Sequence, residues 1–407
     1  MAKESTTVQT PTRRPWLEMG TVTAVHAAVV VLLTTIVTWA QGLPLGAEVD
    51  NRSQITTGDP EFIDAWVRWD SGWYGGIAEN GYFYTPGQQS PIAFFPTYPM
   101  AVRGVSEVVG DTQVAGVLIT VLSGLASVLL LWNWLRPRVN GRARALALAS
   151  FMIYPYAFFI YGAMYSDSLF LVSVLASFSA LEKRWYAMAG LIGIAATAGR
   201  PVGAALVAGL VVRTLELLAE DRSPGTGVIV KGLIGALRSV RPRNTLVLLS
   251  VLGVVGWMAY LGSRFGDPLA FTKAQSSPGW DQGAGPRTWF KIAFGGQMLH
   301  GPWDIKLVLL AQFLVCLLAV LAIPQVFKRF GWGYAAYVVV VLGIPLVGSK
   351  DFLGCGRYVM MAFPVFAVLG ALLDEQARRW VRVAVLALST AGLLVGTFFY
   401  GLGVLIS

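Results

Sequence analysis

Long apolar stretches separated by short polar connectors recur along the whole chain, and this pattern predicts a polytopic membrane protein. A helix needs about 20 predominantly apolar residues to cross a bilayer. We therefore expect an all-α fold with about eleven membrane-spanning helices. Their predicted ranges are 20–41, 113–135, 145–161, 167–182, 185–200, 202–218, 245–263, 306–326, 332–348, 358–374 and 381–405.

The composition excludes an ordinary soluble enzyme. Hydrophobic residues make up 55% of the 407 residues, charged residues only 13%, and the mean hydropathy is +0.62. The first apolar run is as long as a span, so we expect no cleavable signal peptide. Cys316 and Cys355 predict neither a disulfide nor a metal site. We expect one integral membrane domain over residues 1–407.

The basic residues predict an orientation. With 31 Lys and Arg residues against 22 acidic ones, the net charge is +9. If the amino terminus is cytoplasmic, most basic residues lie on the cytoplasmic side, as the positive-inside rule requires. The connectors are then a cytoplasmic tail (1–19), a first outer loop with amphipathic helices (42–112), a basic cytoplasmic loop (219–244) and a second outer loop (264–305). The basic loop suits membrane lipids rather than nucleic acid.

The first outer loop contains the strongest candidate for chemistry, Asp70. If residues 62–74 form one helix, Asp70 lies in the middle of an apolar stripe that includes Trp69 and Trp73. A carboxylate among aromatic rings loses its hydration, and this loss costs free energy unless the carboxylate has a partner. Such a residue more often has a functional role. The alternative is a surface Asp at an interfacial turn, because glycines follow closely. The substrate-binding candidates around Asp70 are Trp69, Ser71, Trp73 and Tyr74.

Two further candidates follow the third predicted span. Tyr165 and Asp167 lie at its outer end, and Asp167 opens the next apolar run. Asp167 is therefore either the N-cap of a helix or a substrate-binding residue. Gln275 belongs to the second outer loop, which we expect to close over the site or to select the acceptor.

Three cations lie at predicted outer ends of spans: Arg200, Lys350 and Arg357. Cations at this depth are costly unless they are paired or face a cavity. A guanidinium matches two oxygens of a phosphate, so we assign all three to a phosphate site. Snorkelling toward lipid headgroups is the alternative, above all for Lys350.

Several motifs are absent from the sequence. It contains no GxxxxGK[ST] loop, no HExxH and no nucleophile elbow. His26 and His300 lack companions at metal-ligand spacing. We therefore expect no cofactor and no metal, and a transfer reaction would draw its energy from a membrane-soluble activated donor.

Short motifs along the membrane region resemble the PIG-V family, also called GPI mannosyltransferase 2, of the GT-C membrane glycosyltransferases. The most specific is Arg68-Trp69-Asp70-Ser71 in the first outer loop. This chain departs from the family pattern at Gly72-Trp73-Tyr74, at Asp167 where Glu is usual, and at Pro201-Val202-Gly203. The other matching segments are 77–82, 93–96, 165–170, 199–203, 356–358 and 363–364.

The resemblance implies an inverting transfer of a sugar, mannose, from a polyprenyl-phosphate donor to a hydroxyl of a lipid-linked or glycan acceptor. Asp70 would be the general base, and Arg200, Arg357 and Lys350 would hold the departing phosphate. The departures leave the acceptor open. The Ala-, Val-, Arg- and Gly-rich composition is typical of a high-GC bacterium, so we expect the plasma membrane, with the site on its extracytoplasmic side.

A transporter or flippase of a lipid-linked or anionic solute is the alternative function. Such a carrier would keep its ionisable residues within spans near the midplane, and many carriers contain inverted repeats. Here the candidate acids and cations gather at one predicted face, and we detect no internal repeat. This asymmetry favours an enzyme, although an inactive scaffold is a third interpretation.

Overall fold

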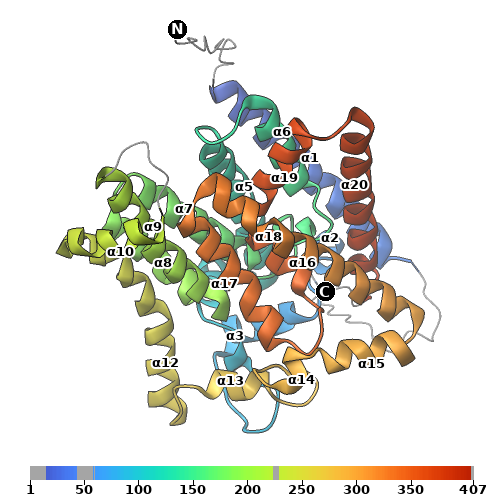
Figure 1. Ribbon diagram of the computed structural model, residues 1–407. Coiled ribbons are helices and arrows are strands. Elements are labelled where there is room, and N and C mark those ends of the chain that lie inside the picture. Colours follow the sequence, from blue (N-terminus) through green and yellow to red (C-terminus); the bar gives the residue numbers. More distant parts are fainter. Residues whose placement is uncertain (1–14, 44–57, 59, 223–228, 405–407) are drawn as a thin grey trace.

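The expected all-α fold is confirmed. The computed structural model describes residues 15–43, 58, 60–222 and 229–404, and these residues form helices and connecting segments without a strand (Figure 1). Most of the predicted tail 1–19, parts of both loops that begin at 42 and 219, and residue 405 of the last predicted span lie outside the described residues. The helices of at least 19 residues are α1 (Pro15–Gln41), α5 (Thr112–Leu135), α9 (Ala204–Arg222), α16 (Trp303–Phe330) and α20 (Arg379–Gly401).

Within the described residues, six helices are long and apolar enough to cross a membrane, which makes the chain a multi-pass membrane protein. They are α1, α5, α16, α20, the stretch Pro201–Arg222 and the stretch Pro242–Phe265. The helices α18 (Cys355–Met361) and α19 (Pro364–Glu375) meet at 77° and make a seventh if they count as one bent span.

Four other predicted spans correspond to helices of 12 to 17 residues in the structure. These are α6 (Gly141–Met152), α7 (Asp167–Glu182), α8 (Tyr186–Thr197) and α17 (Trp332–Gly348), with 12, 16, 12 and 17 residues. The predicted span 145–161, which we expect to be short and interrupted by Pro or Gly, is interrupted at Pro155: α6 ends before it, and only the short helix η2 (Ala157–Ile160) follows. The predicted span 358–374 is bent in the structure, with Pro364 at the bend.

Both predicted outer loops lie at the same end of the molecule. Figure 1 shows α3, α13, α14 and α15 together at the bottom, and the start of α1 with α6 at the top. The face of the membrane that each end occupies remains a prediction. The first loop contains α2 (Glu61–Asp64), α3 (Asp70–Asn80), η1 (Pro91–Ala93) and α4 (Thr97–Val109), and the second contains α13 (Ala270–Gln275), α14 (Pro286–Trp289) and α15 (Ile292–His300).

The remaining helices either precede α9 or join it to the second loop. The chain leaves the predicted basic loop through short helices before it enters the stretch that ends at Phe265. In order, these helices are η3 (Pro201–Gly203), which precedes α9, then α10 (Val230–Ala236), η4 (Leu237–Ser239), α11 (Pro242–Thr245), η5 (Leu246–Val251) and α12 (Leu252–Phe265).

Candidate active site

The helix predicted over residues 62–74 is interrupted immediately before Asp70. The prediction of one helix over 62–74 is wrong, because α2 ends at Asp64 and α3 begins at Asp70 itself. Between them Trp69 takes a φ of 44°, a backbone conformation that L-residues rarely adopt. The fully buried Trp66 ring packs so closely on Gly162 that a Cβ there would overlap it. Long-range packing therefore sets the break, and the break places Asp70 at a helix start.

Buried donors satisfy the carbonyl groups that the break exposes. The Arg68 guanidinium donates to the carbonyls of Asp64 and Val67, both at 2.9 Å. The Tyr400 hydroxyl donates to the Trp66 carbonyl at 2.8 Å, and the Tyr165 hydroxyl donates to the Arg68 carbonyl at 3.2 Å. A buried carbonyl without a partner would cost free energy comparable to a lost hydrogen bond. Arg68 therefore stabilises the conformation of the backbone segment that precedes Asp70.

Four charged side chains, three from the helices α3, α7 and α18 and one from the segment before η3, meet at this point, and we call them the Asp70 cluster: Asp70, Asp167, Arg200 and Arg357. Arg200 Nη1 lies 2.7 Å from Asp167 Oδ2. Arg357 Nη1 lies 3.6 Å from Asp70 Oδ2 and 3.8 Å from Asp167 Oδ2, so its guanidinium bridges the two carboxylates. The structure thus brings together four of the candidates that the sequence nominated.

Asp167 is the fully buried acid of the cluster. Its N-cap interpretation is wrong, because Asp167 is the first residue inside α7, and the cap residue Ser166 makes no side-chain capping bond. The Asp167 side chain is 0% exposed. A charge removed from water to this extent needs paired charges around it, and Arg200 and Arg357 supply them. Asp167 holds both guanidinium groups in place.

Asp70 is the acid that a ligand can reach. Its side chain is 32% exposed, against 13% for Arg357. Burial of its surroundings raises the pKa of Asp70, and the positive charge of Arg357 opposes that rise. The Asp70 backbone amide donates to the Tyr165 hydroxyl oxygen at 3.2 Å, which fixes the start of α3. A reachable carboxylate with a raised pKa suits a proton acceptor.

Aromatic rings enclose the two arginines. The Arg357 guanidinium carbon lies 5.0 Å from the ring centroids of both Phe159 and Tyr165, and that of Arg200 lies 5.1 Å from the Tyr358 ring. Arg357 Nε is buried and has no hydrogen-bond partner among the described residues. A buried N–H without a partner is costly, so this donor suits an anionic ligand.

The sequence analysis did not select Phe159 or Tyr358 as site residues. Tyr358 directly follows Arg357 in the Gly356-Arg357-Tyr358 motif, and that neighbourhood was a usable signal. Phe159 lies in an apolar aromatic run and gave no comparable signal. Its position against Arg357 depends on the fold.

Some of the predicted substrate-binding residues lie close to the Asp70 cluster, and others lie where the two loops meet. Ser71, Tyr74 and Tyr165 are buried beside the Asp70 cluster, where the Tyr74 hydroxyl lies 2.8 Å from Ser166 Oγ. Burial raises the pKa of Tyr74 far above its ordinary value, so its hydroxyl stays protonated. The partly buried Trp69 packs its ring edge-on against Tyr400 at 5.3 Å.

Trp73 and Gln275 lie where the second loop packs on the first. The Trp73 ring contacts the rings of Phe94 and Trp280, with centroids 5.8 and 5.6 Å apart. Gln275 Nε2 donates to the Ala93 carbonyl at 3.5 Å. These contacts fit the expectation that the second loop covers the region of the site.

Lys350 makes its contacts away from the Asp70 cluster. Its ammonium group donates to Asp281 Oδ2 at 3.0 Å and to the Gly279 carbonyl at 2.9 Å. Lys350 therefore ties the second loop to the end of α17. Its assignment to the phosphate site remains a prediction that these contacts do not favour.

Carboxylates and other ligand types do not gather into a metal centre in the part of the chain that the structure describes. No group of three or more His, Cys, Asp or Glu side chains there could hold a metal ion. Asp70 and Asp167 instead share the Arg357 guanidinium.

Comparisons with known proteins found similar folds only among solved structures; no protein-family model and no curated protein matches the chain. ArnT from Cupriavidus metallidurans, bound to undecaprenyl phosphate, is 14% identical with a TM-score of 0.49; the match covers 93% of this chain and 76% of ArnT. The Archaeoglobus fulgidus oligosaccharyltransferase is 13% identical with a TM-score of 0.44, over 92% of this chain and 55% of that enzyme. This chain thus spans about half the length of the archaeal enzyme. Both TM-scores lie below 0.5.

Proposed function

We propose that the chain is a membrane glycosyltransferase of the GT-C type, similar to the PIG-V family, that uses a polyprenyl-phosphate-linked sugar. One observation carries the proposal: a reachable carboxylate, Asp70, lies 3.6 Å from a largely buried arginine whose Nε lacks a hydrogen-bond partner among the described residues. A proton acceptor is thereby set beside an anion site. Transfer of a sugar from a phosphate requires these two functions side by side.

The proposed reaction is a direct displacement at the anomeric carbon. The acceptor hydroxyl oxygen forms a bond to C1 as the bond between C1 and the phosphate oxygen breaks, which inverts the configuration. Asp70 takes the acceptor's proton, and the bonding electron pair leaves with the polyprenyl phosphate. Arg357 and Arg200 stabilise the negative charge that grows on that phosphate. Asp167 keeps their guanidinium groups oriented.

A mostly apolar cavity lined in part by the first loop suits the lipid part of the donor. It has a volume of about 450 Å³ and lies between the first loop, α8 and α12. Ala198, two residues before Arg200, lines it, and Thr97 anchors the first loop by donating its backbone amide to the Ala198 carbonyl at 3.0 Å. Most of its lining is apolar, as a prenyl chain requires. The lining residues are Gly81, Tyr82, Pro96, Met100, Arg103, Ile194, Ala198, Leu252, Gly253, Gly256, Trp257 and Tyr260.

The sugar that we propose is mannose, and the acceptor is a lipid-linked or glycan hydroxyl at the extracytoplasmic face of a bacterial plasma membrane. The sugar follows from the motif resemblance around Arg68-Trp69-Asp70-Ser71. The face follows from the distribution of basic residues.

Mass spectrometry of a deletion strain tests this function. Membrane lipids, glycans and glycoproteins from the deletion strain should contain a species that is short by one hexose, and the native gene should restore it. If the species were short by a pentose instead, the transferred sugar would be a pentose and not mannose. Unchanged lipids and glycans in the deletion strain would reject the transferase function.

A further inference from the structure

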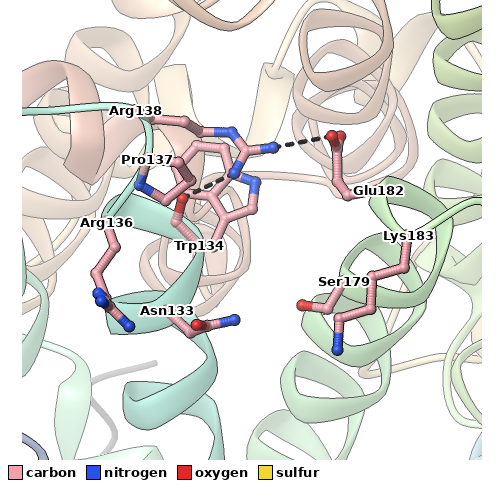
Figure 2. Close-up of a pocket in the computed structure, with 8 residues that line it drawn as sticks. All are labelled: Asn133, Trp134, Arg136, Pro137, Arg138, Ser179, Glu182 and Lys183. Atoms are coloured by element: carbon pink, nitrogen blue, oxygen red, sulfur yellow. Dashed lines mark hydrogen bonds and ion pairs between the residues drawn. The ribbon is translucent and has the colours of Figure 1, made fainter. Parts of the chain in front are cut away.

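A second cavity, which is lined by polar residues, lies at the opposite end of α7 from the Asp70 cluster. Asp167 begins α7 and Glu182 ends it, so at 1.5 Å per residue the two ends are about 22 Å apart. The cavity has a volume of about 400 Å³ and lies between the ends of α5 and α7 (Figure 2). Its lining residues are Asn133, Trp134, Arg136, Pro137, Arg138, Ser179, Glu182 and Lys183.

The single carboxylate of this cavity is already neutralised. Glu182 pairs with Arg138 at 3.2 Å and with Arg213 at 2.8 Å, and it accepts a hydrogen bond from the Tyr334 hydroxyl at 2.8 Å. Arg138 also stacks on the Trp134 ring at 4.6 Å. Figure 2 shows this Arg138–Glu182 pair spanning the cavity. The pair forms a fixed polar wall.

Two other cations of the cavity have no such neutralising partner. Among the described residues, neither Arg136 nor Lys183 has a carboxylate within ion-pairing distance, and both are exposed. Arg136 lies over the Trp132 ring at 5.0 Å, and Lys183 lies over the Trp185 ring at 4.9 Å. The mouth of the cavity therefore carries excess positive charge, with Asn133 and Ser179 as additional hydrogen-bonding groups.

Accessible apolar positions on both helices form stripes that precede the residues of this mouth. On α5, the accessible positions 122, 126 and 129 precede Asn133 with helical spacing on one face. On α7, the accessible positions 172, 176 and 179 precede Lys183 with the same spacing. The stripes consist of Leu122, Ala126 and Leu129 on α5, and of Val172 and Ala176, followed by Ser179, on α7.

We infer that this cavity binds an anionic phospholipid, whose phosphate is attracted by the exposed charges of Arg136 and Lys183 and whose acyl chains follow the two stripes. A basic pocket between membrane helices near their ends is the expected form of such a site. An inorganic phosphate shares the headgroup chemistry, but it would leave the apolar stripes without a role. The site is separate from the Asp70 cluster and does not depend on the proposed reaction.

Lipid titration of the purified protein tests the site. The probes are phosphatidylglycerol, phosphatidylcholine and inorganic phosphate, and binding is measured by native mass spectrometry. The variant is Arg136→Gln with Lys183→Gln. The matched control is Arg378→Gln with Arg379→Gln, which removes the same charge from exposed residues outside the cavity. Melting temperatures in phosphatidylcholine confirm that both variants fold.

We expect the wild type and the control to prefer phosphatidylglycerol over phosphatidylcholine. The cavity variant should lose roughly tenfold or more of its affinity for phosphatidylglycerol. Equal losses in both variants would indicate a general charge effect and overturn the proposal. An unchanged cavity variant, or inorganic phosphate binding as tightly as phosphatidylglycerol, would also overturn it.

Discussion

Replacement of Asp70 by Asn is expected to lower the rate of sugar transfer by about 10²–10⁴-fold, the usual contribution of a positioned general base. Asn keeps the shape of the side chain but cannot take the acceptor's proton. Arg357 keeps Asp167 as its second carboxylate neighbour, so the cluster remains assembled. Transfer should therefore fall while the affinity for the donor changes little.

Incorporation of labelled sugar into membranes of the deletion strain measures this effect. Glu79→Gln is the matched control, because Glu79 is an exposed acid at the far end of the same helix α3. The control should transfer sugar at the wild-type rate. An Asp70→Asn enzyme with activity within a few-fold of the wild type would remove Asp70 as the base.

Replacement of Asp167 by Ala is expected to lower the free energy of unfolding by about 3–5 kcal/mol, the usual cost of breaking a buried ion pair. The substitution leaves Arg200 and Arg357 largely buried and removes the carboxylate that lies within 4 Å of both, at 2.7 and 3.8 Å. Two adjacent guanidinium groups would then repel each other in a site with little access to water.

Unfolding in detergent by heat or denaturant measures this loss. Asp281→Ala is the comparison, because it breaks the ion pair between Asp281 and Lys350. The side chains of these two residues are 53% and 34% exposed, respectively. An exposed pair of this kind contributes about 1 kcal/mol or less. If the two substitutions cost the same, the buried cluster would not stabilise the protein in the way we describe.

Local sequence patterns predicted the helices well where one element determines its own ends. The predicted ranges 167–182 and 332–348 match α7 and α17 residue for residue. The break before Asp70 could not be predicted in this way. It depends on Gly162 receiving the Trp66 ring and on Tyr400 capping the Trp66 carbonyl, from positions far along the chain. A periodicity argument contains no information about such contacts.

The composition of the cluster was predictable, but its pairing was not. An arginine between two short predicted spans, with no acid nearby in the sequence, indicated a site at Arg200, and the fold supplies Asp167 as its partner across 33 positions. Lys350 was also assigned to the phosphate site, yet it pairs with Asp281 in the second loop. One-dimensional charge patterns identify cations that need partners without identifying which partners they obtain.

The most direct test is a structure of the protein with a polyprenyl-phosphate sugar bound. Our account places a phosphate oxygen within hydrogen-bonding distance of Arg357, about 3 Å, and the anomeric carbon on the side that Asp70 faces. A phosphate bound at Lys350, or anywhere that leaves Arg357 paired only with its two carboxylates, would contradict it.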